Sequence, residues 1–374
     1  MAYDVLIVGS GIAGAGAAYE LADGAQVLLL EREAAHGYHT TGRSAALYIE
    51  TYGNAVIRGL TRASRAFFDA PPPGFAGSLL LTERGCLHIA RADQLEALRA
   101  MERAHGAAVV ALGTEPVLQM VPRLRASYVA AGLYEAAAMD IDVDALHQGF
   151  LRGAVARGAD VRTGCGVTAI ARERGTWRVA CASGEVFEAT VVIDAAGPWA
   201  DEVAALAGAR PVGLQPMRRT AVIVDAPAGV DTRGWPALID VDEQFYFKPE
   251  AGRILASPAD ETPSAPCDAA AEELDVAVCI DRMQAAADIP VRRIVRAWAG
   301  LRSFVPDRSP VIGFDAEAQG FFWLAGQGGY GVQTAPAAAR AAAALARGAP
   351  LPADVAANGL TPQALSPARL RPGG

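Results

Sequence analysis

Three glycines near the start of the chain have a spacing that suits phosphate chemistry. They are Gly9, Gly11 and Gly14, and Ile12 and Ala13 lie between the last two. The first two glycines allow a tight turn and a close approach of the backbone to a pyrophosphate, and the third allows a helix to pack closely on a strand. A helix that begins at this turn offers free N–H groups and a partial positive charge to phosphates. We therefore expect these five residues to form part of a dinucleotide site.

The elements around the glycines support this expectation. Residues 3–8 form an apolar run, residues 13–21 are typical of a helix, and residues 25–30 are typical of a second buried strand. Glu31 ends that strand, next to Arg32, at a point where a carboxylate can accept hydrogen bonds from a ribose hydroxyl. An acid there favours FAD or NAD over NADP, because it would repel the 2′-phosphate of NADP. The alternative is a simple glycine-rich turn.

A second glycine-rich segment, near the other end of the chain, favours FAD over NAD. Residues 326–333 read GQGGYGVQ and precede an alanine-rich stretch, 334–347, which we expect to be helical. A helix N-terminus beneath the N1–C2=O edge of a flavin would stabilise the negative charge of reduced flavin. A plain strand–helix turn is the alternative. The predicted flavin contacts in this segment are Gly328, Gly329, Tyr330, Gly331, Val332 and Gln333.

The composition excludes some classes of protein. The chain has 374 residues, of which 52% are hydrophobic and 20% charged, so it can bury a sizeable core. A net charge of -8 argues against a nucleic-acid partner. The five cysteines are scattered and show no Cys-x-x-Cys spacing, which fits a reducing compartment and predicts neither a disulfide framework nor a metal site.

The ends of the chain and its apolar segments bear on location. The chain opens directly with a predicted strand and shows no cleavable apolar leader. Its apolar segments are too short, or too interrupted by charge, to span a bilayer. We expect a cytoplasmic protein that is a monomer or a homodimer, and a peripheral contact with the inner membrane stays open.

The chain also alternates between two kinds of sequence. Helices are expected at 55–68 and 144–156, a strand at 161–170, a hairpin at 177–182 and 186–187, and buried strands at 190–193 and 321–324. Short strand-like stretches separated by turns fill much of the remainder. We expect a mixed α/β (α+β) fold, in which a Rossmann-like FAD-binding domain is interleaved with a smaller, mainly antiparallel β substrate domain. The first would comprise 1–75, 145–212 and 300–374, and the second 76–144 and 213–299.

Several blocks of this sequence resemble the D-amino acid oxidase-like superfamily of FAD-dependent oxidoreductases. The two glycine segments and the stretch TVVIDAAGPW at 190–199 carry that likeness. Within the superfamily, the chain is most similar to the bacterial FAD-dependent D-arginine dehydrogenases, a branch of the D-amino acid dehydrogenases. The blocks behind this are HTTGRSAA (39–46), DIDVDALHQGFLR (140–152), GLQPMRR (213–219), FYFKP (245–249), WAGLRSF (298–304) and QGGYGVQT (327–334).

The resemblance implies non-covalently bound FAD and a set of contacts. The implied contacts with the pyrophosphate and the flavin ring are Thr40, Thr41, Gly42, Arg43, Ser44, Ala45 and Ala46. Val167 would contact the adenine side through its backbone. Ala196 and Gly197, in the turn within the block 190–199, are further implied cofactor contacts. The implied substrate contacts are Tyr52, Arg219, Tyr246, Arg302 and the carbonyl of Gly329.

These substrate contacts also make physical sense by themselves. A guanidinium such as that of Arg302 can grip a carboxylate through two parallel N–H···O bonds, and Arg219 can assist it. Tyr246 can add a phenolic hydrogen bond, and the Gly329 carbonyl can accept one from the substrate amine. We expect Arg302, Tyr246 and Tyr52 to lie at the reacting centre. As alternatives, an arginine is most often a solvated surface residue, and each tyrosine can be a simple core aromatic.

The sequence departs from the D-arginine dehydrogenase pattern at the expected side-chain pocket. Cys86 stands where that group has a glutamate, and Leu47 and Ile49 stand where it has a histidine and a threonine. All three changes remove polarity, and a buried cation without a partner is strongly destabilising. Glu50 and Glu83 lie nearby in sequence and could supply the missing charge. We hypothesise a preference for apolar, aromatic or cyclic D-amino acids over cationic ones.

The reaction implied by the resemblance is the oxidative deamination of a D-amino acid. A hydride would pass from Cα to flavin N5, and the resulting imino acid would be hydrolysed to a 2-oxo acid and ammonia. The electrons would pass to a quinone or another acceptor. The alternatives are an oxidase that reduces oxygen to hydrogen peroxide, a 2-hydroxy-acid oxidoreductase with the same fold, and a flavoprotein without catalytic activity.

Overall fold

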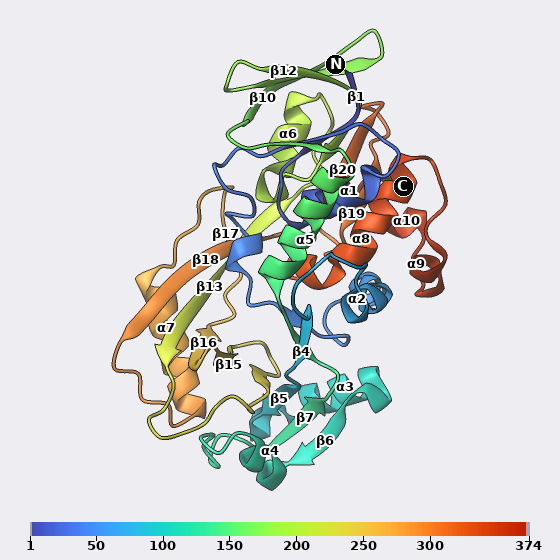
Figure 1. The fold of residues 1–374 in the computed structure, drawn as a ribbon. Helices are drawn as coiled ribbons and strands as arrows, with labels where there is room; N and C mark the ends of the chain where they lie inside the picture. Colours follow the sequence, from blue (N-terminus) through green and yellow to red (C-terminus); the bar gives the residue numbers. More distant parts are fainter. Residues whose placement is uncertain (1, 372–374) are drawn as a thin grey trace.

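The computed structural model describes residues 2–371, which form two large sheets and one small one. Figure 1 shows the first large sheet in the upper half of the molecule and the second in the lower half. The first has eight strands, in the order β10-β11-β12-β1-β2-β9, with β20 and β19 added beside β12. Its strands are β1 (Ala2–Val8), β2 (Val27–Leu30), β9 (Asp160–Arg162), β10 (Val167–Glu173), β11 (Thr176–Cys181), β12 (Val186–Asp194), β19 (Val311–Phe314) and β20 (Phe321–Ala325).

The centre of the first sheet is parallel and covered on both faces. β1 pairs in parallel with β2 and β12, and β12 pairs in parallel with β20. Alternate side chains of a strand point to opposite faces. Val5 and Ile7 therefore pack in the core shared with the helices α1, α5 and α8, whereas Leu6 and Val8 pack in the core shared with α6. A parallel strand buried on both faces reads as a continuous apolar run, as β1 does.

The helices of this half have the following bounds. They are α1 (Ile12–Leu21), α2 (Ala55–Asp69), α5 (Val143–Ala156), α6 (Ala200–Leu206), α8 (Gly331–Ala346), α9 (Ala353–Ala357) and α10 (Pro362–Leu365). Helices α1 and α8 pack against each other, and α2 packs on the other side of α8. Most alanines of α8 are buried between these helices. Their small side chains allow α1 and α2 to pack closely against α8.

The second sheet has nine strands and is antiparallel except where β5 and β14 run in parallel. Its main path is β17-β13-β16-β15-β14-β5-β7-β6, and β18 pairs along β13. Its strands are β5 (Cys86–Ala90), β6 (Val110–Gly113), β7 (Ala131–Glu135), β13 (Gln215–Asp225), β14 (Ala237–Asp240), β15 (Tyr246–Glu250), β16 (Arg253–Ser257), β17 (Thr262–Pro263) and β18 (Ile294–Phe304). A third sheet joins β3 (Leu47–Tyr48), β4 (Leu81–Glu83) and β8 (Met139–Ile141).

Two sequence predictions need correction, and several helices were not predicted. The strand expected at 161–170 is two strands, β9 and β10, because the chain turns between them with Gly164 in the left-handed region (φ +68°). The strands expected at 186–187 and 190–193 are one, β12, which pairs with β11 at its start and with β1 along most of its length. Six helices were not predicted: α3 (Leu95–His105), α4 (Thr114–Met120), α7 (Glu273–Ala286), and also α6, α9 and α10. Among the described residues, no helix combines the length and apolarity needed to cross a bilayer.

Candidate active site

Three adjoining cavities run from the glycine turn of the first sheet to the second sheet. The turn cavity, of about 370 Å³, lies beside Gly9, Glu31 and Val167. The middle cavity, of about 130 Å³, shares Gly11 and Thr41 with the turn cavity. The tyrosine cavity, of about 420 Å³, contains Tyr52 and shares Tyr246, Arg302 and Gly329 with the middle cavity.

The backbone at the turn cavity is so close-packed that glycine is required. A Cβ atom on Gly14 would lie 1.9 Å from the carbonyl oxygen of Gly9, and a Cβ on Gly9 would lie 2.5 Å from that of Ala195. Gly9 also adopts φ +100°, which L side chains rarely reach. Gly14 therefore does not line the cavities, but lets α1 approach the turn, which is the packing role that its position in the pattern predicts.

Glu31 holds the glycine turn from the neighbouring strand. Its carboxylate accepts hydrogen bonds from the backbone N–H of Ser10 (3.0 Å), the Ser10 hydroxyl (2.7 Å) and the backbone N–H of Glu33 (3.0 Å). A carboxylate has about four acceptor positions, so one is left for a ribose hydroxyl at the wall of the turn cavity. The sequence predicted the ribose contact but not the bonds to Ser10.

Two helix N-termini open into the cavities. Helix α1 begins at Ile12, whose N–H donates to the Thr41 hydroxyl at 3.0 Å, and α8 begins at Gly331. Neither helix has an acidic residue in its first turn, so the partial positive charge of each N-terminus is not neutralised there. The helix predicted to begin at 334 thus begins three residues earlier, which brings its N-terminus to the middle cavity.

Most residues predicted to contact the cofactor line one of these cavities. They are Gly9, Gly11, Ile12, Ala13, Glu31, Arg32, Thr40, Thr41, Arg43, Ser44, Ala45, Ala46, Val167, Ala196, Gly197, Gly328, Gly329, Gly331, Val332 and Gln333. Gly42 does not, because it faces a separate surface groove, and Tyr330 does not, because its ring is buried against that of Tyr52 (centroids 4.7 Å apart).

Arg43 lines the middle cavity, but its charge points elsewhere. Its guanidinium donates to the carbonyls of Ala269 (2.7 Å) and Ala299 (3.0 Å) and pairs with Asp268. Its own carbonyl accepts a hydrogen bond from the Trp298 indole at 3.0 Å. The expected contact of Arg43 with a pyrophosphate or flavin is therefore limited to its backbone and aliphatic stem.

Arg302 lies where the middle and tyrosine cavities meet. Its guanidinium reaches the Tyr52 hydroxyl at 3.5 Å and forms no ion pair with any acidic residue among residues 2–371. Gly329 packs against it so closely that a Cβ there would lie 2.9 Å from the guanidinium carbon. An arginine that is always charged and lacks a carboxylate partner is suited to bind one from a ligand.

Arg219, in contrast, is already engaged. Its guanidinium donates to the carbonyl of Asp260 at 2.7 Å and to Glu261 at 3.3 Å, although part of the side chain still lines the tyrosine cavity. Tyr246 lines both cavities beside it. The structure thus brings together the predicted substrate residues Tyr52, Arg219, Tyr246, Arg302 and Gly329, with Arg302 as the available cation.

Tyr52 stands on a turn that two side chains hold in place. Glu135 accepts hydrogen bonds from the N–H of Glu50 (3.0 Å) and from the Thr51 hydroxyl. Gln333 from α8 bonds both backbone groups of Ile49. Burial raises the pKa of Tyr52 above its ordinary value, so its phenol stays protonated at neutral pH and serves as a hydrogen-bonding group.

The predicted side-chain pocket is only partly where the sequence placed it. Leu47 and Ile49 line the tyrosine cavity, but Cys86 does not: it is fully buried in a cluster with Ile49 and Ala138. Glu50 and Glu83, which could have supplied a charge, do not line the cavity either; among the described residues, Glu243 is the one carboxylate that does.

Several residues of this cavity were missed by the sequence reasoning. His88 lies two residues beyond Cys86 on β5, and the period of two in a strand could have pointed to it. One face of α3 contributes Ala97, Ala100, Met101, Ala104 and His105. Their helical spacing was a usable signal, although the charged residues of α3 hid it.

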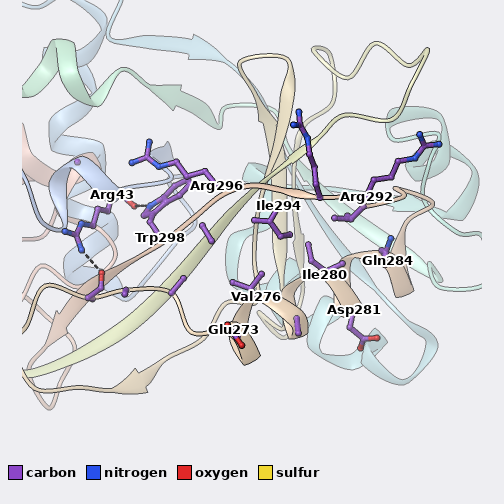
Figure 2. Close-up of a pocket in the computed structure, with 18 of the residues that line it drawn as sticks. Arg43, Glu273, Val276, Ile280, Asp281, Gln284, Arg292, Ile294, Arg296 and Trp298 are labelled. Atoms are coloured by element: carbon purple, nitrogen blue, oxygen red, sulfur yellow. Dashed lines mark hydrogen bonds between the residues drawn. The ribbon is translucent and has the colours of Figure 1, made fainter.

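A larger groove on the surface is separate from this run of cavities. It has a volume of about 1140 Å³ and lies between α7 and β18, as Figure 2 shows with Val276 and Ile280 on one side and Ile294 and Trp298 on the other. Among the described residues, its lining includes none of the predicted substrate residues. Of residues 40–46, the predicted cofactor loop, it includes Gly42 and Arg43.

The sequence as a whole matches a known family. A family model described as FAD dependent oxidoreductase, and named DAO, matches residues 4–345. The chain belongs to this family. The glycine oxidase of Geobacillus kaustophilus (strain HTA426) is 26% identical over 353 residues, which cover 89% of this chain and 90% of that protein.

Solved structures show the same fold. Glycine oxidase from Geobacillus kaustophilus superposes with a TM-score of 0.80 at 23% identity, covering 93% of this chain and 95% of its own. L-α-Glycerophosphate oxidase from Mycoplasma pneumoniae, solved with FAD bound, gives a TM-score of 0.83 at 19% identity, with coverages of 93% and 95%. L-Proline dehydrogenase from P. horikoshii gives 0.79 at 21%, with coverages of 98% and 97%. The predicted superfamily and fold class are confirmed.

The prediction of FAD as the cofactor is confirmed by the family, and the residues of this chain fit it. The close-packed glycine turn leaves backbone at the wall of the turn cavity, and the N-termini of α1 and α8 face the run of cavities. Ser303, which lines the middle cavity, has a buried hydroxyl without a partner among residues 2–371. Such a hydroxyl is suited to a polar atom of the flavin. Non-covalent attachment stays a prediction.

Proposed function

We propose that this protein oxidises the Cα–N bond of a D-amino acid and so produces an imino acid. The observation that carries the proposal is the unpaired guanidinium of Arg302 at the junction of the middle and tyrosine cavities. A substrate carboxylate would satisfy it through charge-assisted hydrogen bonds. Bound FAD supplies the two-electron oxidant for this reaction.

The residues around Arg302 would orient the substrate. The Tyr52 and Tyr246 hydroxyls would bond the same carboxylate, and the Gly329 carbonyl, on the segment that enters α8, would accept a hydrogen bond from the substrate amine. Holding the amino acid at these points fixes Cα toward the middle cavity, which is the positioning that a hydride transfer requires. The amine loses a proton and Cα a hydride to the flavin, and water then converts the imino acid of a primary amine to a 2-oxo acid and ammonia. The imine of a cyclic substrate would instead open to an amino 2-oxo acid without release of ammonia.

The walls of the tyrosine cavity favour an uncharged side chain. Leu47, Ile49, Ile239 and Val241 line it, and Glu243, its carboxylate, lies on an exposed turn at the rim. A cationic side chain inside would be desolvated without a buried partner, which destabilises the complex strongly. We therefore propose apolar, aromatic or cyclic D-amino acids as substrates. Glycine oxidase and L-proline dehydrogenase, by their names, act on amino acids too.

Anaerobic bleaching of the flavin tests this proposal. D-Leucine, D-phenylalanine, D-proline and D-arginine, with their L-enantiomers, would be mixed with the holoenzyme, and the loss of flavin absorbance would be followed. We expect the uncharged D-amino acids to bleach the flavin faster than D-arginine. A panel in which no amino acid bleaches it would refute the proposal, and a dominant D-arginine rate would refute the side-chain preference.

The acceptor is part of the same proposal. We propose a dehydrogenase that passes electrons to a quinone or another carrier. Turnover under air would be measured in parallel as dye reduction and as hydrogen peroxide release. Peroxide formed in step with substrate consumption, at a rate equal to dye reduction, would identify an oxidase instead.

A further inference from the structure

The floor of the tyrosine cavity is a row of three side chains on neighbouring strands. His88 of β5 is the register partner of Ile239 of β14, and Ile239 is the register partner of Tyr246 of β15. Register partners point to the same face of a sheet, and all three residues line the cavity. Because adjacent strands lie about 4.8 Å apart, His88 is about 10 Å along the sheet from Tyr246.

His88 is a polar group built into an apolar wall. Its side chain is buried, with 8% of the residue exposed, and its Nδ1 lies 3.9 Å from the Cys86 sulfur. Burial lowers the pKa of His88 to about 4, so the ring is neutral at pH 7. Burial also raises the pKa of Cys86 well above its ordinary value, which keeps it a neutral thiol.

The second ring nitrogen of His88 has no partner. Among residues 2–371, no group forms a hydrogen bond with Nε2, although the ring lines the tyrosine cavity. Nε2 donates in one tautomer and accepts in the other. Nε2 is not among the buried polar atoms that lack a partner, so it is accessible from the cavity, where a polar group of a ligand can bond it in place of solvent.

The wall contributed by α3 leaves room for a large ligand. Ala97, Ala100 and Ala104 present small side chains to the cavity, whose 420 Å³ is far more than a substrate of glycine's size would fill. Cavities of roughly 300–1,000 Å³ are typical of ligands with many heavy atoms. The space therefore suits a side chain of aromatic size that extends along the row toward His88.

We propose that His88 is a specificity-determining residue that reads the far end of the substrate side chain. The substrate is then a D-amino acid whose aromatic side chain ends in a neutral hydrogen-bonding group, such as the hydroxyl of tyrosine. A hydroxyl both donates and accepts, so it can pair with either tautomer of His88. This inference rests on the proposed function, and it narrows the substrate class to side chains with a polar tip.

Comparing D-tyrosine with D-phenylalanine tests the inference, because the two differ by one hydroxyl. A neutral hydrogen bond contributes about 0.5–1.5 kcal/mol, so the holoenzyme should favour D-tyrosine about three- to tenfold in kcat/KM. His88→Leu should remove that preference, because it lowers kcat/KM for D-tyrosine more than that for D-phenylalanine. His88→Gln, which keeps a donor and an acceptor, should restore part of the preference.

A control variant and the panel separate the possible failures. Glu102→Leu, on the outer face of α3 and outside the cavity lining, should leave the D-tyrosine preference unchanged. Equal kcat/KM for the two substrates in the unaltered protein, or an unchanged preference in both His88 variants, would overturn the role of His88. If no amino acid bleached the flavin, the proposed function itself would fail.

Discussion

The turn cavity and the tyrosine cavity are built by different means. The turn cavity is shaped by backbone: glycines without side chains, the N-terminus of α1 and a carboxylate that bonds main-chain N–H groups. The tyrosine cavity is shaped by side chains from β5, β14, β15, β18 and the face of α3. Backbone features depend on short sequence patterns, whereas the second cavity depends on the register between distant strands. The two can be perturbed separately.

Replacing Arg302, at the junction of the middle and tyrosine cavities, should give the largest effect, on turnover rather than on FAD content. Arg302→Met removes the cation that would bind the carboxylate, and truncation of one partner of a buried charge pair costs about 2–5 kcal/mol. We expect kcat/KM to fall about 10²- to 10³-fold while the FAD content per protein stays the same. Steady-state kinetics and the flavin absorbance spectrum measure both.

The matched control is Arg296→Met, an exposed arginine on the same strand. It should change kcat/KM less than twofold. A fall of less than tenfold in Arg302→Met would mean that the carboxylate is held elsewhere.

Replacing Gly14 should have the opposite pattern. In Gly14→Ala the new Cβ would meet the Gly9 carbonyl at 1.9 Å, so α1 and the turn must move apart. Overpacking of this kind costs about 1–3 kcal/mol. We expect FAD to be lost from the purified protein, as measured by the ratio of flavin to protein absorbance. Gly77→Ala, where a Cβ would meet nothing within 4 Å, should retain FAD; full FAD content in both variants would contradict this account.

Filling the tyrosine cavity from α3 should discriminate between substrates. Ala100→Phe places a ring in the space that a large side chain would use. We expect kcat/KM for D-phenylalanine to fall about tenfold, an effect of about 1.4 kcal/mol, and that for D-alanine to change little. Glu102→Phe, on the outer face of the same helix, serves as the control. Equal losses for both substrates would argue against α3 as the wall of the site.

A last effect concerns stability rather than turnover, at the strand end that leads to the turn cavity. Burial raises the pKa of Asp194 well above its ordinary value, and its Oδ2 has no partner among residues 2–371. The pKa of Asp194 is therefore higher in the folded than in the unfolded protein. The unfolded chain loses this proton first, at the ordinary aspartate pKa of about 4, so the free energy of unfolding falls as pH rises above that value. Asp194→Asn should remove this loss, and its gain in unfolding free energy should grow by at most about 1.4 kcal/mol per pH unit.

Thermal unfolding between pH 5 and pH 8 measures this difference. Asp281→Asn makes the same change of charge at an exposed site and should show no such trend. A gain in Asp194→Asn that stays constant with pH would show that packing, not ionisation, explains it.

The features of the turn cavity could be predicted from the sequence more fully than those of the tyrosine cavity. The strand–helix–strand unit that ends at Glu31 could be predicted, because one continuous segment at the start of the chain contains all its parts. Arg302 and Tyr246 were found through short blocks that resemble a family. His88 and α3 were missed, since the sequence does not state that β5 lies beside β14. Cys86, which the sequence predicted to line the pocket, is buried in a cluster with Ile49, whereas His88, two residues further along β5, lines the cavity.

The bonds of Arg43 join the cofactor loop to a distant part of the chain. Through Ala269 and Asp268 they fasten the segment before α7, and through Ala299 and Trp298 they fasten β18. A loop held on one side by a bound dinucleotide and on the other by these contacts has fewer conformations to lose when either forms. Binding of the dinucleotide to this loop and docking of Asp268, Ala269, Trp298 and Ala299 on it are therefore linked. Each stabilises the other by the same free energy.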